Sequence, residues 1–258
     1  HRIVTQILGF AGKKQSGKNT ACNYIIALKL IELGVSKKTR LSANGSIEVS
    51  DIFGETKGEQ KWFEFSEKNL NISKLLNDGV GQYVRIYGLA DTLKDMCISV
   101  LGLTYNQAYG RDKDKNSETD IAWGNVPSQH MNFKSKKMTA REVLQYVGTD
   151  IFRKLDPDVW IKSLLRKIEK DSPEVALICD VRFKNEILKL QESGGFIVGL
   201  TRDPYNSADL HSSEKEIEEC FSLCDCIVDN QDKTIEQQLE LIHGCIKHLP
   251  NVFPVMEK

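Results

Sequence analysis

Short apolar runs alternate with helical patterns along this chain, and the alternation predicts the fold. The first run, residues 2–9, is expected to form a buried strand, and apolar residues then recur at helical spacing over 18–32. The same two patterns predict strands at 83–87, 175–179, 196–200 and 226–229, and helices at 91–101, 139–152, 156–170, 185–193, 213–219 and 234–247. Because these strands are apolar throughout, we expect a parallel sheet covered on both faces by helices. The pattern predicts a doubly wound α/β fold.

Two polar stretches interrupt this pattern. In the first, residues 35–80, an Asn44-Gly45 pair between short apolar-polar alternations predicts a β-hairpin with a tight turn. The second, residues 104–138, is long and charged, as loops that cover a functional site often are. We therefore expect one domain over residues 1–258, with a hairpin-like insertion at about 35–80 and a lid or cover segment at about 104–138.

Composition narrows the class of protein. Of 258 residues, 40% are hydrophobic and 28% charged, which is typical of a globular protein and argues against disorder, collagen or a coiled coil. With 35 basic and 36 acidic residues the net charge is −1, so a general nucleic-acid partner is disfavoured, although the Lys134–Lys137 stretch is locally basic. No apolar run approaches the roughly 20 residues of a membrane helix, and we expect neither a membrane partner nor a signal peptide.

The seven cysteines give little sign of a metal site. Cys220, Cys224 and Cys226 lie close together, but no second Cys-x-x-Cys pair or His-x₃-His partner accompanies them, which argues against zinc. Cysteines inside apolar strand candidates act as small hydrophobic residues. We expect a reducing, cytoplasmic compartment.

The segment Gly12-Lys-Lys-Gln-Ser-Gly-Lys18 matches the P-loop pattern G-x₄-G-K. It lies between a strand and a helix, where glycines let backbone N–H groups wrap phosphate oxygens and the helix dipole favours an anion. Lys18 is expected between the β- and γ-phosphates of ATP. Asn19 follows where Ser or Thr is usual, so Mg²⁺ is expected on Asn19, directly or through water, with Thr20 one place later as the alternative. The ATP-binding candidates are Gly12, Lys13, Lys14, Gln15, Ser16, Gly17, Lys18, Asn19 and Thr20.

Asp180 ends an apolar strand, and Arg182 follows two residues later. Open α/β sheets bind ligands at the carboxyl ends of their strands, so Asp180 is a candidate for a Mg²⁺-bound water or a substrate hydroxyl, with a simple turn residue as the alternative. Phosphoryl transfer between two anions also needs several cations. Those at the ends of elements are Lys94, Arg141, Arg153, Arg182 and Arg202. His211-Ser-Ser-Glu214 lacks a third group to orient the histidine, so we interpret it as a helix start near the site.

These motifs, taken in order, resemble a known family. They are residues 12–20, 87–94, 141–149, 152–153, 158–160, 180–186, Arg202, 211–214 and 229–230. The set resembles the phage-type deoxynucleoside monophosphate kinases, which have the P-loop nucleoside monophosphate kinase fold. The resemblance implies an α/β P-loop NTPase three-layer sandwich with a doubly wound, mostly parallel sheet. It differs at Asn19, where the family commonly has an acid.

The resemblance also implies an activity and a set of roles. The activity is ATP- and Mg²⁺-dependent phosphorylation of deoxynucleoside 5′-monophosphates to diphosphates for dNTP synthesis. The compartment would be the cytoplasm of a host cell. Some relatives form homodimers, so a homodimer is expected as an option here. Lys18, Arg141 and Arg182 would be catalytic. The monophosphate side would be formed by Lys14, Lys94, Arg141, Gly148, Thr149, Arg153, Trp160, Asp180, Arg182 and Glu186.

Other interpretations remain open at this point. A P-loop kinase of another phosphorylated acceptor, such as a phosphomevalonate-type enzyme, shares the P-loop and the Asp-x-Arg pair. A non-catalytic ATP-binding regulator would share the P-loop alone. Trp160 is either a wall for base or sugar, or a core residue of an amphipathic helix. Neither the accepted bases nor the choice between ribose and deoxyribose follows from these residues.

Overall fold

The computed structural model describes residues 4–42, 46–51, 61–65, 79–125, 136–204 and 212–253, and the side chains of 125 and 212–215 lie outside this description. The chain divides into two compact units. Unit 1 comprises residues 1–88 and 165–258, and unit 2 comprises residues 89–164. Each unit is described by itself.

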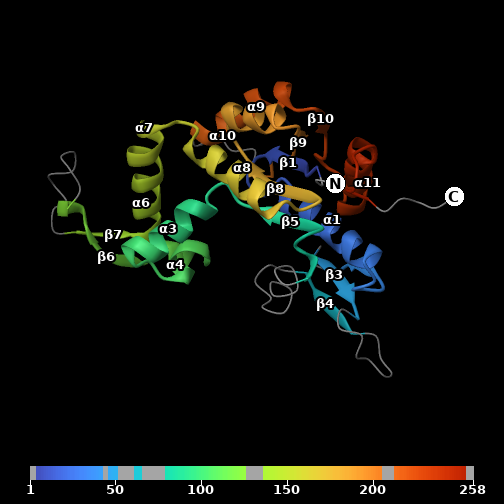
Figure 1. Ribbon diagram of the computed structural model, residues 1–258, viewed down its shortest axis with the longest axis horizontal. Helices are drawn as coiled ribbons and strands as arrows, with labels where there is room; N and C mark the ends of the chain where they lie inside the picture. Colours follow the sequence, from blue (N-terminus) through green and yellow to red (C-terminus); the bar gives the residue numbers. More distant parts are fainter. Residues whose placement is uncertain are drawn as a thin grey trace. The chain divides into compact units, whose positions relative to one another are not determined.

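Unit 1 contains a parallel sheet whose described strands lie in the order β10-β9-β1-β8-β5 (Figure 1). These strands are β1 (Gln6–Gly12), β5 (Val84–Tyr87), β8 (Val175–Val181), β9 (Phe196–Leu200) and β10 (Cys226–Val228). The central strand β1 pairs with β8 on one side and β9 on the other, and all but its first residue are buried. The carboxyl ends of β1, β8 and β9 therefore meet at one edge of the sheet.

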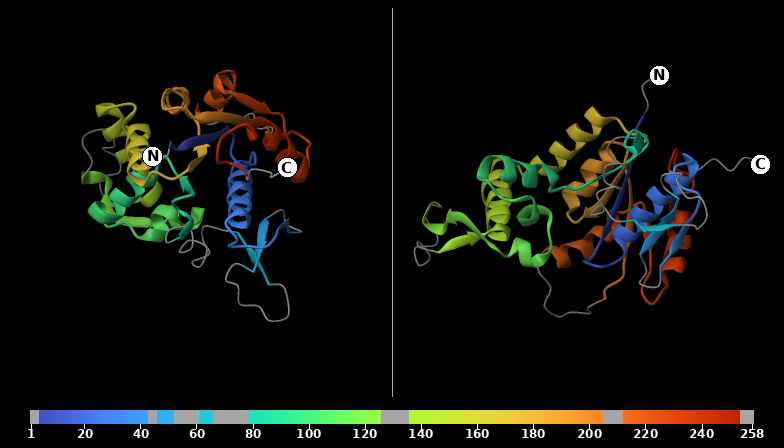
Figure 2. Two further views of the ribbon diagram at one scale, coloured as in Figure 1. Left: turned by 45° about the vertical axis from the view of Figure 1, so that its right-hand side comes forward. Right: turned by 90° about the horizontal axis from the view of Figure 1, so that it is seen from below.

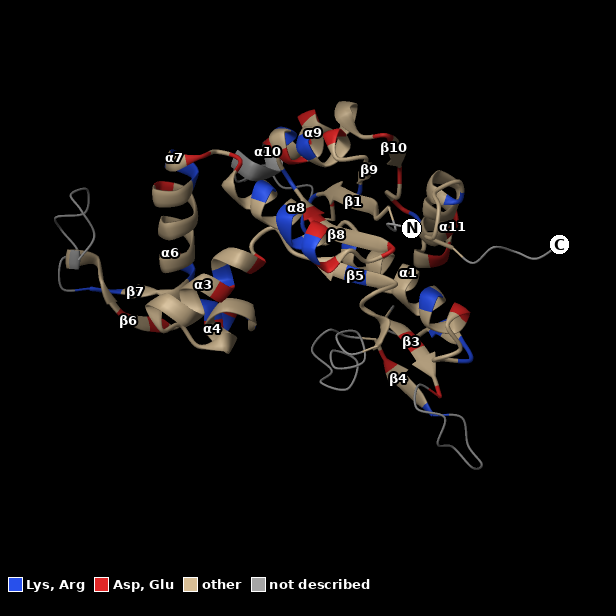
Figure 3. Ribbon diagram, in the orientation of Figure 1, with Lys and Arg blue, Asp and Glu red and all other residues tan. Residues whose placement is uncertain are grey.

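Helices cover both faces of this sheet (Figure 2). α1 (Lys18–Glu32) and α11 (Ile235–Ile246) pack on one face, and α9 (Lys184–Glu192) and α10 (Ser212–Cys220) pack on the other. The core between α1, α11 and the sheet is apolar, with Leu8, Phe10 and Ile25 fully buried. Both signs of charge lie along α9, as Figure 3 shows. This layered, parallel architecture confirms the predicted fold class.

A small antiparallel sheet follows α1. β2 (Thr39–Leu41) pairs with β3 (Ile47–Ser50), and β3 pairs with β4 (Trp62–Glu64). The predicted hairpin is thus confirmed in its two strands, and its Asn44-Gly45 turn lies outside the described residues. Arg40 joins these strands, since its guanidinium forms an ion pair with Glu48 at 2.7 Å and stacks 3.9 Å from the Trp62 ring centroid.

Unit 2 has a core of its own. It is built from α3 (Asp91–Leu101), α4 (Tyr105–Tyr109), α5 (Asp112–Lys115), β6 (Glu118–Ala122), a 3₁₀ turn (Trp123–Asn125), β7 (Lys137–Thr139), α6 (Ala140–Gln145), the π-helix η4 (Tyr146–Phe152) and α7 (Arg153–Leu155). Thr139 and Glu142 form the capping box that their spacing predicts. The segment 104–138, expected as a loop, instead carries two short helices and a paired strand. Leu103, Ala108 and Met138 are buried, and burial of these apolar side chains stabilises the elements.

The other boundaries agree with the sequence to within a few residues. β1 begins and ends later than expected, and β8 continues through Asp180 to Val181. α8 (Val159–Asp171) begins three residues later than the expected start at Asp156. No helix in the described parts of the chain is both long enough and apolar enough to cross a membrane.

The end of α8 supplies a polar contact to the edge of the sheet. The Asp171 carboxylate accepts hydrogen bonds from the Arg85 guanidinium at 2.7 Å and from the Tyr87 hydroxyl at 3.0 Å. Tyr87 is 1% exposed, and its burial together with the charge of Asp171 raises its pKa.

We expect Asp171→Ala to lower the free energy of unfolding by about 1–3 kcal/mol, because a buried phenol and a half-buried guanidinium lose a charged partner. Urea unfolding followed by circular dichroism measures this loss. Glu192→Ala, which removes the exposed Lys189 ion pair, is the matched control and is expected to leave stability nearly unchanged. Equal losses in the two variants would contradict the role of Asp171.

Candidate phosphate-binding site

The loop from β1 to α1 is built around glycines that no larger residue fits. A Cβ on Gly12 would lie 2.7 Å from the Leu200 carbonyl oxygen and 2.5 Å from the Ser16 hydroxyl. Gly17 caps α1 with φ 102°, a left-handed conformation that favours glycine, and Gln15 has φ 59°. A Cβ on Gly17 would also come within 2.4 Å of the Gln238 amide oxygen. Close packing therefore requires glycine at Gly12, and both close packing and backbone conformation require it at Gly17.

Lys18 folds back over the loop that precedes it. Its ammonium donates to the carbonyl of Gly12 at 2.7 Å and to that of Lys13 at 2.5 Å, and the residue is 7% exposed. In a trans peptide the N–H points opposite to the carbonyl of the same plane. Holding these two carbonyls therefore turns the N–H groups of Lys13 and Lys14 away from Lys18.

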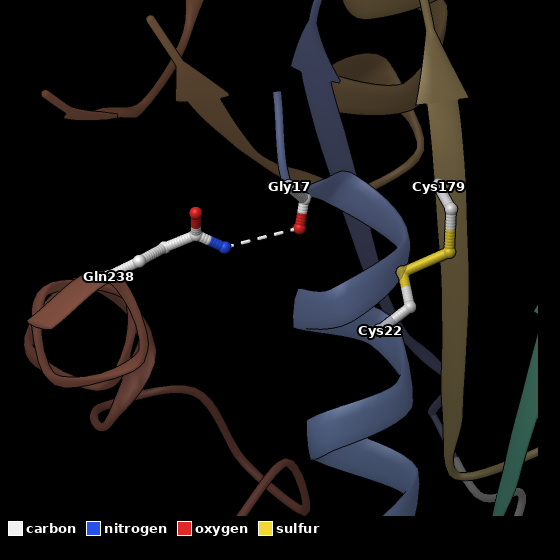
Figure 4. Close-up of a disulfide and its surroundings, with 4 residues drawn as sticks. All are labelled: Gly17, Cys22, Cys179 and Gln238. Atoms are coloured by element: carbon white, nitrogen blue, oxygen red, sulfur yellow. Dashed lines mark hydrogen bonds between the residues drawn. A yellow bond between two sulfur atoms is a disulfide. The ribbon is translucent and has the colours of Figure 1, made fainter. Parts of the chain in front are cut away.

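A pair of buried amides holds the other end of the loop. The Asn230 amide donates to the Ser16 carbonyl and to the Gln238 amide oxygen, both at 2.7 Å. The Gln238 amide in turn donates to the Gly17 carbonyl at 3.2 Å (Figure 4). Asn230 and Gln238 are at most 1% exposed. We call them the amide pair; it turns the Gly17 and Lys18 N–H groups away from itself, as expected of a loop that binds an anion.

Lys13 has a different role from the other lysines of the motif. Its ammonium forms ion pairs with Asp203 at 2.7 Å and Glu218 at 2.6 Å, and the residue is 6% exposed. Burial lowers the pKa of this ammonium, but the hydrogen bonds and negative charges of Asp203 and Glu218 outweigh burial and raise it overall. The Lys13 side chain thus links the loop to α10 and to the segment after β9, and the backbone N–H of Lys13 stays the candidate for a phosphate contact.

A cavity of about 560 Å³ lies beside the loop. Its lining comes from the loop, from the ends of β8 and β9 and from α11: Lys14, Gln15, Gly17, Lys18, Asn19, Thr20, Cys179, Asp180, Arg182, Arg202, Ile235 and Gln238. Four of these side chains are basic and one is acidic, so the cavity suits an anion. Six of the nine predicted ATP-binding residues line it, together with Asp180 and Arg182.

Asp180 and Arg182 are paired at the end of β8. The guanidinium nitrogen Nε of Arg182 lies 2.7 Å from the Asp180 carboxylate, and both side chains are roughly half exposed. Glu186, by contrast, is 3% exposed and accepts the backbone N–H groups of Arg182 and Phe183 at 2.9 and 3.0 Å. Glu186 therefore shapes the turn that carries Arg182, and it does not line the cavity.

Arg202 reaches the cavity from the end of β9. Its backbone N–H donates to the Asn230 side-chain oxygen at 2.8 Å, and its guanidinium donates to the carbonyls of Asn230 and Lys233 at 3.1 and 2.6 Å. The amide pair thus orders this arginine as well as the loop. Sequence analysis counts Arg202 among the available cations but does not assign it to the site.

The remaining predicted residues belong to unit 2. Arg141 is half exposed and bonds to Asp112 and Asn116, each at 2.9 Å, and Lys94 lies 4.7 Å from the Tyr109 ring centroid. Thr149 is exposed and Arg153 half-buried.

Trp160 is 7% exposed in the core of unit 2, and its indole N–H donates to the Gly148 carbonyl at 3.1 Å. A Cβ on Gly148 would lie 2.7 Å from Leu93 Cδ2. These contacts fit the core-packing alternative for Trp160, and its place in the monophosphate site stays a prediction.

The residues at the cavity fit Mg²⁺. Asn19, Thr20 and Asp180 supply hard oxygen donors, which Mg²⁺ prefers. Within the described ranges no three His, Cys, Asp or Glu side chains gather as a metal cage. Mg²⁺ bound with a nucleotide does not need one, because phosphates and water fill most of its coordination sphere.

Three features define the class of P-loop phosphotransferases. They are a glycine loop between the central strand and a helix, a buried lysine at the end of that loop, and a cavity suited to an anion at the carboxyl edge of a parallel sheet. Comparison with known proteins identifies the family. The model of the family described as deoxynucleotide monophosphate kinase matches residues 6–241. The chain belongs to this family, and it is a kinase of deoxynucleoside monophosphates.

Two viral relatives agree with this assignment. A protein of Acanthamoeba polyphaga mimivirus, provisionally named a deoxynucleotide monophosphate kinase, is 30% identical over 172 residues, which span 61% of this chain and 80% of that protein. The deoxynucleoside-5′-monophosphate kinase of Escherichia phage T5 is 44% identical over 57 residues, which span 22% of this chain and 23% of that protein. Membership in the family implies ATP as the phosphoryl donor.

The sequence alone does not reveal the amide pair. Asn230 lies in the Asp229-Asn230 step of the resemblance without a role, and Gln238 lies inside a helix where nothing in the pattern singles it out. A glutamine on the buried face of an amphipathic helix is the one available signal, since a buried amide needs hydrogen-bond partners.

We expect Gln238→Met to lower kcat/KM for ATP by roughly tenfold or more. The Gly17 carbonyl keeps the Ala21 N–H as a donor but loses the Gln238 amide, and the buried Asn230 amide loses an acceptor, so the direction of the loop N–H groups is less fixed. Steady-state kinetics with varied ATP measure this loss. Gln191→Met removes a comparable amide that bonds to the Leu223 carbonyl at 2.8 Å, and it is the matched control. Unchanged kinetics in the Gln238 variant, or equal losses in both, would contradict the role of the amide pair.

Proposed function

We propose that the cavity beside the β1–α1 loop binds the phosphates of ATP and that the acceptor monophosphate binds on its Asp180–Arg182 side. The observation that carries this proposal is the shared cavity, where Lys18 on α1 and the ion pair of Asp180 and Arg182 at the end of β8 line one space of about 560 Å³. A donor phosphate and an acceptor phosphate must meet within one such space for in-line transfer.

The backbone N–H groups of residues 13–18 and the Lys18 ammonium are the proposed ligands of the ATP phosphates. Lys18 bonds to the Gly12 and Lys13 carbonyls. We propose that its ammonium also donates to the β- and γ-phosphates of ATP, because an ammonium on a long, unbranched side chain has three N–H donors. A cation at this position stabilises charge that spreads over the transferring group in the transition state.

Asn19 is the proposed Mg²⁺ ligand, directly or through water, with Thr20 as the alternative. Mg²⁺ would neutralise phosphate charge, and Asp180 is placed at the same cavity to hold one of its waters. The position usually held by Ser or Thr is Asn here, and an amide carbonyl is an oxygen donor of the same hard type.

Arg182 is the proposed clamp for the acceptor phosphate, because a guanidinium presents two parallel donors to a phosphate. The monophosphate itself is ionised near neutral pH and needs no protein base. From unit 2 we propose Lys94, Arg141, Gly148, Thr149, Arg153 and Trp160 as further parts of the acceptor site, on the resemblance alone. Arg141 would exchange its Asp112 partner for phosphate. The described part of 104–138 is proposed to help exclude water from the site.

Two further properties are proposed on the resemblance only. One is a homodimer, and the other is action in the cytoplasm of a host cell. Neither the phosphomevalonate-type reaction nor a non-catalytic regulator is favoured, since the matched family is one of deoxynucleotide kinases.

Lys18→Ala is expected to reduce kcat by roughly 10²-fold or more, because the transition state loses a cation that stabilises its charge. ADP formation at saturating ATP and monophosphate measures this loss. The exposed Lys37→Ala, in the loop after α1, is the control and is expected to retain full activity. A Lys18 variant with near-normal turnover would refute the proposed placement of ATP.

Arg182→Lys is expected to raise KM for the monophosphate by roughly tenfold, with KM for ATP little changed, because lysine binds phosphate as a point charge and loses one of two parallel hydrogen bonds. Varying each substrate at saturation of the other separates the two constants. If KM for ATP rises and that for the monophosphate does not, then Arg182 belongs to the donor side.

A further inference from the structure

A disulfide joins the phosphate-binding helix to the strand that carries Asp180. Cys22 lies in the second turn of α1 and Cys179 directly precedes Asp180 in β8, and their sulfurs are bonded across 157 residues of sequence (Figure 4). From the sequence, Cys179 is expected to act as a small hydrophobic residue, because it lies in an apolar strand. The pairing instead links the two elements that are proposed to hold donor and acceptor.

The two sulfur-bearing residues differ in access. Cys22 is fully buried, whereas Cys179 is 9% exposed and lines the cavity of the phosphate-binding loop. A reagent from solution therefore meets the bond from the Cys179 side, through the same space that is proposed to hold ATP.

The cavity also suits the reacting species of thiol–disulfide exchange, which is a thiolate. Lys14, Lys18, Arg182 and Arg202 line it, with Asp180 as the single acidic residue among the lining side chains. Positive charge around the cavity attracts an incoming thiolate towards the Cys179 sulfur.

The chain's own thiols are poor candidates for this attack. Cys97, Cys220 and Cys224 are the cysteines outside disulfides. Burial raises the pKa of Cys97 to about 11 and that of Cys224 to about 12, and it raises the pKa of Cys220 as well. These groups are protonated near neutral pH, so the attacking thiolate comes from outside the chain.

We propose that the Cys22–Cys179 disulfide is a thiol–disulfide exchange site that opens to the nucleotide cavity through Cys179, takes a small thiol as its reactant, and is closed by bound ATP. The inference rests on the proposed placement of ATP in this cavity. It adds a covalent modification site to the kinase.

The exchange balances as follows for a dithiol. One thiolate of the dithiol attacks the Cys179 sulfur, the bond to Cys22 breaks, and the Cys22 sulfur leaves as a thiolate that takes up a proton. The second thiolate of the reagent attacks its own sulfur in the mixed disulfide, and Cys179 leaves as a thiolate and is protonated. The protein gains two electrons and two protons, and the dithiol is oxidised to a cyclic disulfide.

The chain offers an internal control. A second disulfide, Cys226–Cys245, joins β10 to α11, and both of its residues are half-buried but do not line the cavity. If the nucleotide closes a path of access, then it protects the first disulfide and leaves the second unprotected.

The test follows both disulfides in the wild-type protein, purified without reductant. Dithiothreitol is added with and without Mg²⁺ and ATP, samples are quenched with iodoacetamide, and each cystine is quantified by peptide mass spectrometry. Calorimetry on the same sample establishes ATP binding. At ATP ten times above its Kd, reduction of Cys22–Cys179 is expected to slow about tenfold, while that of Cys226–Cys245 is unchanged.

The outcomes separate the two proposals. If calorimetry detects ATP binding but Cys22–Cys179 is reduced equally fast with and without it, then the exchange site is overturned and the proposed function stands. Failure to find the Cys22–Cys179 cystine in the oxidised protein also overturns it. If ATP does not bind, then the proposed function fails.

A second measurement tests the exchange site without ATP. The wild-type protein is treated with 2-mercaptoethanesulfonate, a small anionic monothiol, and the mixed disulfide is located by mass spectrometry. The adduct is expected on Cys179, and an adduct on Cys22 instead would overturn the proposal.

Discussion

The structure depends on one constraint, which is that a tight turn between β1 and α1 must keep its backbone N–H groups directed at an anion. Each buried carbonyl of this turn needs a hydrogen-bond donor on the side away from the anion, because a buried carbonyl without a donor lowers the stability of the fold. Lys18 supplies partners to the first two carbonyls of the loop, and the amide pair Asn230–Gln238 supplies them to the last two. The N–H groups of the same peptide planes then face away from these partners. The positions of the bonded carbonyls therefore determine where the N–H groups of the proposed anion site point.

The parallel sheet brings the partners of the loop together from distant parts of the sequence. β1, β8 and β9 end at one edge, so the loop, Asp180 and Arg202 lie around one cavity although more than 160 residues separate the first from the second. The same topology brings α11 against α1, which places Gln238 on Gly17. The fold thus explains why one short loop, the proposed phosphate site, is held by residues near the end of the chain.

The sequence predicts the fold and the loop well, and the supporting residues poorly. Apolar strands and amphipathic helices are local patterns, so the bounds of α1 and α3 agree with expectation. The P-loop spacing is equally local. Gln238 and Cys22 depend on contacts between distant elements, which no short pattern records. The sequence pattern of 104–138 predicts a loop, because charged residues dominate it. The few residues that become buried, such as Ala108 and Met138, are too widely spaced to form a helix or strand pattern. Glu186 and Trp160 are assigned to the site by resemblance. In the structure the Glu186 carboxylate accepts the Arg182 N–H, and the Trp160 indole donates to the Gly148 carbonyl. Such side-chain bonds to the backbone cannot be predicted from residue types alone.

We propose that phosphoryl transfer from ATP to a deoxynucleoside monophosphate takes place in the cavity beside this loop. The most direct measurement is ADP formation with ATP and Mg²⁺ against dAMP, dCMP, dGMP and dTMP, their ribose counterparts, and a sample without acceptor. With at least one deoxynucleotide we expect ADP formation that far exceeds that of the sample without acceptor. Intact ATP binding with no acceptor-dependent ADP from any monophosphate would contradict it.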